Sequence, residues 1–144
     1  MKKILKGLVL LAFLFLLSAC TKDYKAITYT KFTEIFESEE GYLVNDSSHI
    51  YDEQFERYIE ASGKNNLFIY YEFKTEDAAR NYVALNYKNK KNFKYKDKKE
   101  YIIVKSTKNR YFYLIQIDKT VIVGSSDLKS SKKEINRMFK KLGY

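Results

Sequence analysis

The fold class is decided by residues 101–124, which read YIIVKSTKNRYFYLIQIDKTVIVG. This stretch holds three short runs rich in β-branched and aromatic residues: Tyr101–Lys105, Arg110–Asp118 and Thr120–Gly124. Only Ser106–Asn109 and Asp118–Lys119 separate these runs, and links of that length join antiparallel neighbours in hairpins. The stretch therefore predicts a three-stranded antiparallel meander.

A fourth strand is predicted at Leu67–Phe73, where apolar or aromatic side chains occupy both alternating faces. Such a pattern is typical of an interior strand that is covered on both sides. Thr75 follows as a candidate N-cap, and Glu76 and Asp77 lie in the first turn, where the helix dipole favours negative charge. We therefore expect a helix that begins after Thr75 and ends near Tyr87.

Helical spacing predicts the other helices. Apolar residues recur every three or four positions in three more stretches: residues 30–40, 51–61 and 126–142. In the second stretch, Tyr51, Phe55 and Ile59 lie on one helical face. Residues 42–44 are predicted to form a short strand between the first two of these helices.

Together these elements predict an α+β protein with the order α-β-α-β-α-β-β-β-α. We expect one domain over residues 30–144, built on a largely antiparallel sheet of four to five strands with helices packed mainly on one side. A domain of this length buries on the order of two thirds of the surface of its unfolded chain. The core can therefore hold the fold together without a disulfide.

The first twenty residues have the layout of a secretory signal. A basic start precedes an apolar run over residues 7–17, which ends in the small-residue sequence Leu17-Ser18-Ala19-Cys20. This ending resembles the lipobox of bacterial lipoproteins, and composition adds a similarity to the short lipoproteins of low-GC Gram-positive bacteria. The resemblance implies removal of residues 1–19, diacylation of Cys20, and a short tether over residues 20–29.

An uncleaved transmembrane helix is the alternative interpretation of this segment. Fourteen residues separate Lys6 from Thr21, whereas a membrane span needs about 20 apolar residues. Cleavage and lipid attachment therefore fit better, and the expected location is the extracytoplasmic face of the cell membrane. Because Cys20 is the only cysteine, its acylation leaves no thiol for a disulfide or for nucleophilic chemistry.

Charge is distributed unevenly along the chain. Residues 20–87 carry 7 basic and 13 acidic side chains, whereas residues 88–144 carry 17 basic and 5 acidic ones. This asymmetry predicts a dipolar domain whose basic half faces an anionic membrane or wall. An AT-rich coding sequence would also enrich lysine, asparagine and tyrosine, so part of the lysine excess has a compositional explanation.

The densest positive charge lies in residues 88–99, which we expect to form a loop. Seven lysines and two interleaved aromatic residues are the candidate binding residues: Lys88, Lys90, Lys91, Lys94, Lys96, Lys98, Lys99, Phe93 and Tyr95. Lysines there are suited to anionic lipid headgroups or anionic wall polymers, with the rings stacking or anchoring. Nucleic acid is not an expected partner. The alternative is a solvated loop without a ligand.

Tyrosine is abundant, with 14 residues in the chain, and two interpretations remain open. Each buried tyrosine hydroxyl needs a partner or water. Either several tyrosines line a groove for a peptide, a glycan or a partner protein, or they lie at the margin of the core with their hydroxyls in water. An exposed aromatic cluster on one sheet face would favour the groove.

Residues for common catalytic chemistry are sparse. His49 is the only histidine, so no metal site and no cofactor are expected. Ser47 and Ser48 precede His49 and lie close to acids, but no nucleophile elbow is present, and a polar loop explains the stretch. A glycosidase needs only two carboxylates across a cleft, and the sequence singles out no pair.

The sequence therefore predicts a lipid-anchored extracytoplasmic lipoprotein that works as a non-enzymatic binding or accessory module. Its expected partners are the membrane, through the lipid anchor, and an anionic lipid, a wall polymer or a surface protein. The alternative function is a hydrolase of wall or carbohydrate material that uses carboxylates that the sequence does not identify.

Overall fold

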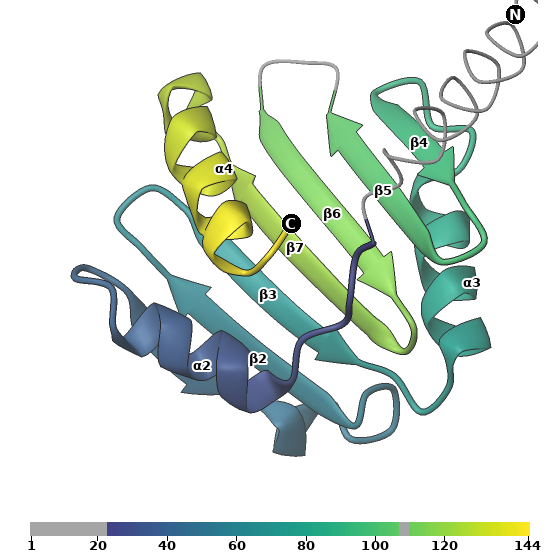
Figure 1. The fold of residues 1–144 in the computed structure, drawn as a ribbon, viewed down its shortest axis with the longest axis horizontal. Coiled ribbons are helices and arrows are strands. Elements are labelled where there is room, and N and C mark those ends of the chain that lie inside the picture. Colours follow the sequence, from purple (N-terminus) through teal and green to yellow (C-terminus); the bar gives the residue numbers. More distant parts are fainter. Residues whose placement is uncertain (1–22, 107–109) are drawn as a thin grey trace, which may run out of the picture.

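The computed structural model describes residues 23–106 and 110–144, which form one seven-stranded antiparallel sheet flanked by helices (Figure 1). The strands are β1 (Leu43–Asp46), β2 (Arg57–Ser62), β3 (Leu67–Glu72), β4 (Phe93–Asp97), β5 (Tyr101–Ser106), β6 (Tyr111–Ile117) and β7 (Thr120–Ser126). The α-helices are α2 (Tyr29–Glu37), α3 (Glu76–Tyr87) and α4 (Lys132–Lys141). Short 3₁₀ helices cover Ser48–Ile50 and Lys129–Ser131.

The strand order is β1-β2-β3-β7-β6-β5-β4, and every pairing is antiparallel. The predicted meander is confirmed as β5-β6-β7. β3 is an interior strand, as its two apolar faces predict, because it pairs with β2 on one side and β7 on the other. The β3–β7 pairing joins the N-terminal and C-terminal halves of the chain into one sheet.

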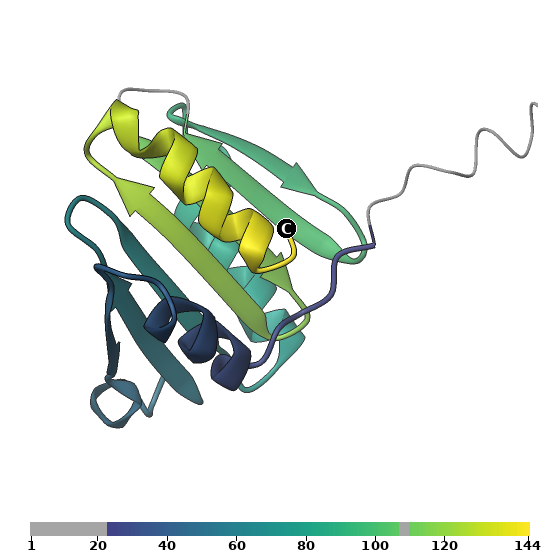
Figure 2. The same cartoon turned by 60° about the vertical axis from the view of Figure 1, so that its left-hand side comes forward.

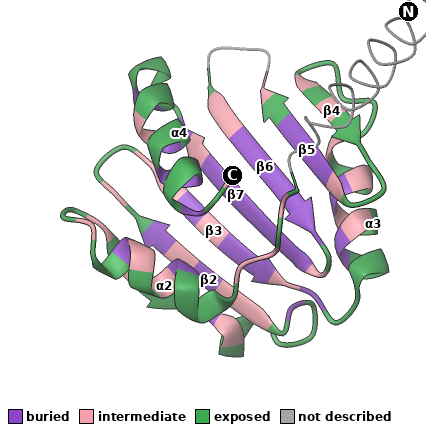
Figure 3. Ribbon diagram, in the orientation of Figure 1, coloured by how far each residue is buried: buried purple, intermediate pink, exposed green. Residues whose placement is uncertain are grey.

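The helices lie on both faces of the sheet, not mainly on one (Figures 1 and 2). We call the face that bears Phe68 and Tyr70 face A, and the face that bears Tyr71 face B. α2 and α4 cover face A with two apolar stripes: Phe32, Phe36, Ile135, Met138, Phe139 and Leu142. α3 covers face B through Ala79 and Val83. The middle strands are consequently buried on both sides (Figure 3).

The prediction of four to five strands in the order α-β-α-β-α-β-β-β-α is wrong, and one cause is the helix predicted at residues 51–61. Residues 57–62 form β2, which pairs with β1 and β3. Phe55 packs with the face B cluster and Ile59 with the face A cluster, so the two residues do not share a helical face. Pairing with neighbouring strands outweighed the helical spacing, since strand formation depends strongly on tertiary context.

The second cause is residues 88–99, which are not one loop. Phe93–Asp97 forms β4, an edge strand paired with β5 along five register positions. Aromatic and charged residues alternate over the first four residues of FKYKD, the period expected of a half-exposed strand. Lysine on an edge strand also discourages pairing with other chains. The high lysine content concealed this alternation.

The stretch expected to act as a tether lies partly on the domain. From Tyr24 to Ile27 the chain runs along face A, and Tyr70 donates a hydrogen bond from its hydroxyl to the Ile27 carbonyl oxygen at 3.3 Å. The Ile27 N–H donates in turn to the Tyr144 hydroxyl at 3.3 Å. Cys20 and the lipobox lie outside the described residues. Among the helices within the described ranges, none has the length and apolar character needed to cross a membrane.

Candidate functional site

β4 places the lysines and the aromatic residues of the predicted cluster on opposite faces of the sheet. Lys94 and Lys96 lie on face A, because their cross-strand partners are Lys105 and the core residue Ile103. Phe93 and Tyr95 lie on face B and pack against the core cluster beneath α3. The rings therefore point away from Lys94 and Lys96 and do not form one surface with them.

The other five lysines of the predicted cluster lie at opposite ends of β4. Lys88, Lys90 and Lys91 belong to the connection from α3, and Lys98 and Lys99 belong to the turn into β5. Arg80 holds that turn by donating hydrogen bonds to the backbone carbonyl oxygens of Lys98 at 3.0 Å and Lys99 at 3.3 Å. The contiguous sequence cluster is thus dispersed over the edge of the domain.

Face A instead brings together lysines from three elements. Lys94 of β4 lies directly opposite Lys105 of β5, whose partner on β6 is Tyr113. Like charges at directly opposed positions of neighbouring strands repel each other and destabilise the pairing. Lys132, at the start of α4, lies at the other side of the same surface, over the ring of Tyr111.

Each of three lysines lies near the face of a tyrosine ring. The Nζ atoms of Lys96, Lys105 and Lys132 are 5.6, 4.8 and 5.9 Å from the centroids of their rings. Cation–π contacts of this kind hold an ammonium group in place without neutralising its charge. We define the basic patch by four lysines and three tyrosines: Lys94, Lys96, Lys105, Lys132, Tyr101, Tyr111 and Tyr113.

Two tyrosines of the basic patch, Tyr111 and Tyr113, have a raised pKa and add no negative charge at neutral pH. Burial, and to a smaller extent the neighbouring tyrosines, raise the pKa of Tyr113 to about 12. Burial also raises the pKa of Tyr111, whose hydroxyl donates a hydrogen bond to Asn136 Oδ1. Over the part of the chain that the structure describes, no carboxylate forms an ion pair with Lys94, Lys96 or Lys132, so the patch presents net positive charge.

The described chain begins beside the basic patch. Tyr24 packs edge-on against Tyr101, with 4.9 Å between the ring centroids, and its ring lies 6.1 Å from that of Tyr144. Tyr144 donates a hydrogen bond from its hydroxyl to the Lys25 carbonyl oxygen at 3.0 Å. The N-terminal segment is thereby fixed next to Lys96 and Tyr101, four residues after Cys20 in the sequence.

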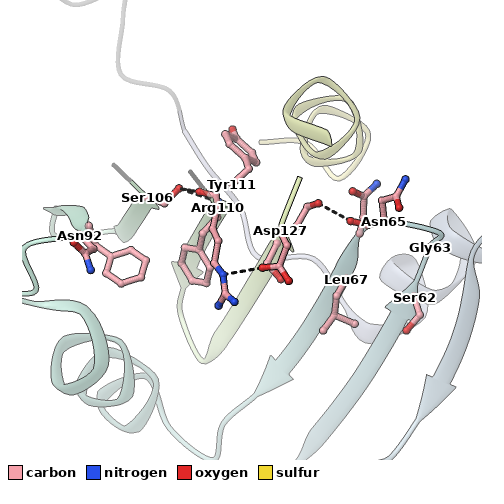
Figure 4. Close-up of a pocket in the computed structure, with 14 residues that line it drawn as sticks. Ser62, Gly63, Asn65, Leu67, Asn92, Ser106, Arg110, Tyr111 and Asp127 are labelled. Atoms are coloured by element: carbon pink, nitrogen blue, oxygen red, sulfur yellow. Dashed lines mark hydrogen bonds and ion pairs between the residues drawn. The ribbon is translucent and has the colours of Figure 1, made fainter. Parts of the chain in front are cut away.

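Face B carries a groove of about 910 Å³ where the strands end (Figure 4). Its floor is one row of cross-strand neighbours from six strands: Ser62, Leu67, Ser125, Phe112, Ser106 and Phe93. Figure 4 shows Ser62 and Leu67 on the side of the sheet away from α4, whereas Tyr111 points toward α4. The floor of the groove thus lies on the face opposite the lysines of the basic patch, and Tyr111, which lines one end of the groove, belongs to both sites.

α3 leaves this row partly open. The last turn of α3 reaches it through Tyr87, whose ring packs on Phe93 and Phe112 with centroid distances of 5.1 and 5.2 Å. Beyond these rings Leu67 and Ser125 are half-buried. The result is a hollow with an apolar and hydroxyl-bearing floor.

The rim of the groove is polar. Arg110 and Asp127, at the neighbouring ends of β6 and β7, form an ion pair at 2.8 Å, and both side chains are largely exposed (Figure 4). Ser126 donates a hydrogen bond to the Asn65 carbonyl oxygen at 2.6 Å, which fixes the turn between β2 and β3 against β7. No sequence pattern indicated this groove, because its lining comes from six strands and their connections.

A second hollow, of about 790 Å³, lies at the opposite ends of the strands and is lined by two carboxylates that share one lysine. Glu56 and Glu72 both accept hydrogen bonds from Lys119 Nζ, at 2.7 and 2.9 Å. The pair is thus engaged in an ion-pair network. Within residues 23–106 and 110–144, no cluster of three or more histidine, cysteine, aspartate or glutamate side chains is arranged to hold a metal ion.

The polar stretch before β2 has a structural role. The Ser48 hydroxyl donates to Asp46 and accepts a hydrogen bond from the Tyr58 N–H at 2.9 Å, while Asp46 also accepts from the Ser48 N–H at 2.9 Å. His49 is exposed beside this turn. The serine therefore connects a 3₁₀ turn to β2 and is not paired with the histidine.

Comparison with known proteins identifies no relative: no family model matches the chain, and no curated protein matches it. The chemistry of the two sheet faces therefore carries the evidence for function.

Proposed function

We propose that this protein is a lipid-anchored extracytoplasmic binding module whose basic patch holds face A against the anionic headgroups of the membrane. The observation that carries this proposal is the position of the patch beside Tyr24. An extended chain spans at most about 3.6 Å per residue, so a lipid on Cys20 would lie within about 14 Å of Tyr24. The anchor and the patch would then meet the same membrane.

The charge arrangement supports this orientation. Within the described residues, Lys94, Lys96 and Lys132 form no ion pair with a carboxylate, so an anionic surface can supply their counter-charge. Each lysine close to an anionic surface contributes about 1 kcal/mol to membrane binding, and salt weakens this contribution. Tyr101 and Tyr24 are suited to the headgroup region, where amphipathic rings are favoured.

The sequence-based alternative was a hydrolase. Glu56 and Glu72, the two glutamates that meet in the second hollow, are both ion-paired with Lys119. Glycoside hydrolysis requires one carboxylic acid that is free to donate a proton and a second that is free to attack or to activate water. This arrangement supports a binding role over a hydrolytic one.

The test measures binding to vesicles of phosphatidylglycerol and phosphatidylcholine over a range of salt concentrations, in a Cys20→Ser background that removes the anchor. The variant K94Q/K96Q/K105Q/K132Q removes the basic patch, and we expect at least about tenfold weaker binding and a shallower salt dependence. A matched variant, K64Q/K74Q/K90Q/K91Q, removes the same charge from exposed lysines outside the patch and should bind nearly as the parent does.

Equal losses in the two variants would show that net charge alone drives binding and would overturn the role of the patch. Binding to lipoteichoic acid in the absence of vesicle binding would assign the phosphate chemistry to a wall polymer instead. In cells, the Cys20→Ser protein should leave the membrane fraction and lose labelling by a palmitate analogue. Retention of both would contradict the lipid anchor.

A further inference from the structure

We propose that the groove on face B is a binding site for a neutral oligosaccharide. This inference goes beyond membrane attachment, because the floor of the groove lies on the face opposite the lysines of the basic patch and shares only Tyr111 with the patch. The floor would remain accessible with face A on a membrane. Its volume of about 910 Å³ is within the range of pockets that enclose small ligands, about 300–1,000 Å³.

The floor of the groove matches the two-sided chemistry of a sugar ring. Half-buried apolar side chains, Leu67, Phe112 and Phe93, alternate along the row with serines. A sugar ring has apolar C–H faces and hydroxyl edges, so it needs apolar surface and hydrogen-bonding groups at short intervals. Neighbouring strands lie about 4.8 Å apart, which sets the spacing between an apolar side chain and the next hydroxyl.

The serines of the groove floor differ in whether their hydroxyl groups are free to bind a ligand. Ser106 is occupied, since its hydroxyl donates to the Arg110 carbonyl oxygen and accepts from the Phe112 N–H at 3.1 Å. Over the described residues, the hydroxyls of Ser62 and Ser125 have no hydrogen-bond partner. Each can donate one hydrogen bond and accept others, so both can bind the hydroxyl groups of a ligand.

The charged side chains that line the groove favour a neutral ligand. Among the described residues that line the groove, Arg110 and Asp127 are the only charged side chains, and they neutralise each other in an ion pair. The pair presents donors on one side and acceptors on the other, and the exposed amides of Asn65 and Asn92 add both types. An anionic or cationic ligand would meet no compensating net charge.

Backbone pairing disfavours a peptide as the ligand. A bound peptide strand commonly adds to the exposed edge of a sheet through main-chain hydrogen bonds. The middle of the groove floor, at Leu67, Ser125 and Phe112, belongs to β3, β7 and β6, which all have neighbours on both sides. Recognition must therefore use side chains, which suits the many hydroxyls of a glycan.

The experiment titrates the full-length protein in detergent micelles with chitohexaose and with cellohexaose, and follows binding by calorimetry and amide chemical shifts. We expect saturable binding with shifts at Ser62, Leu67 and Ser125. Ser125→Trp fills the groove and should weaken binding at least about tenfold, a loss of about 1.4 kcal/mol. Ser38→Trp, at the exposed end of α2 on the other face, should leave binding unchanged.

A second variant keeps the test decisive if Ser125→Trp fails to fold. In R110A/D127A the replaced side chains are 80% and 77% exposed, so the fold should persist while affinity falls several-fold. Absence of saturable binding by either sugar, or an affinity that R110A/D127A does not change, would overturn the proposal. Ser125-dependent binding of a neutral hexapeptide without sugar binding would replace the glycan by a peptide. The variant K94Q/K96Q/K105Q/K132Q should bind sugar normally, which separates this result from membrane attachment.

Discussion

At the scale of single residues, the lack of a Cβ atom at one position determines how closely α4 packs on face A. Gly124 of β7 lies under α4, and a Cβ atom there would meet Phe139 Cε2 at 2.6 Å and Phe68 Cε1 at 2.8 Å. Both rings are buried in the same cluster and have little room to move. The absence of a side chain at Gly124 is thus what allows α4 to approach the sheet.

We expect Gly124→Ala to lower the free energy of unfolding by about 1–3 kcal/mol, because overpacking forces the rings out of their positions. Urea denaturation followed by tyrosine fluorescence measures this change. Ser125→Ala, at the next position but on face B, is the matched control and should shift the free energy by less than about 0.5 kcal/mol. An unchanged midpoint in Gly124→Ala would show that α4 can move away at no cost.

The residues of the basic patch also show how much of the candidate site the sequence can predict. Lys94 and Lys96 belong to the predicted cluster of seven lysines, whose anion-binding role stays a prediction, and the period of two in β4 places Phe93 and Tyr95 on the other face. Lys105 and Lys132 were missed, because they join the patch through strand register and helix packing. Neither effect is encoded within a short window of sequence.

At the scale of secondary-structure elements, charged side chains connect α4 to the chain that follows α2. Arg137 donates hydrogen bonds to Glu134 on α4, at 2.7 and 2.8 Å, and to Glu39 beyond α2, at 2.8 Å. Lys141 also donates to Glu39. The hydrogen bonds from Arg137 lower the pKa of Glu134, against the opposing effect of partial burial. Ionised Glu134 is therefore favoured in the folded state.

This shift predicts a pH dependence of stability. Because the pKa is lower in the folded state, the contribution of Glu134 is fully present above its unfolded pKa of about 4.3 and is lost as the pH falls through the folded pKa. Glu134→Gln should therefore show a smaller loss of stability than the wild type between neutral pH and about pH 3. Urea midpoints across that range measure the difference.

Glu37→Gln serves as the control, since Glu37 is exposed at the end of α2 and should leave the acid dependence as it is in the wild type. If Glu134→Gln and the wild type lose stability in parallel on acidification, the Arg137 network does not contribute to the pH dependence.

At the scale of the whole molecule, the centre of the sheet is buried on both faces, whereas its edge strands are largely exposed. β3, β7 and β6 pair on both sides and lie beneath helices, whereas β1 and β4 are edges and are largely exposed. Local opening costs most where backbone groups are paired and buried on all sides. The proposed membrane face and the proposed glycan groove are carried by opposite faces of this rigid centre.

Hydrogen exchange should follow this gradient. Amides of β3, β7 and β6 should exchange only through global unfolding, while those of β1 and β4 should exchange at least about a hundredfold faster through local opening. Mass spectrometry of peptic fragments resolves these segments. Equal protection of β4 and β7 would show that the β4 edge opens only with the whole domain.

The sequence by itself determined the locally encoded features: the meander of residues 101–124, the interior character of Leu67–Phe73, and the helix that Thr75 caps. These features depend on periodicity and capping, which act over a few residues. Tertiary structure decided that residues 57–62 form a strand and that helices cover both faces. It also decided which lysines share a surface, because the β3–β7 pairing and the strand register join segments that are far apart in the chain. A side-chain period of two then sends adjacent residues to opposite faces, so neighbours in sequence become separated in function.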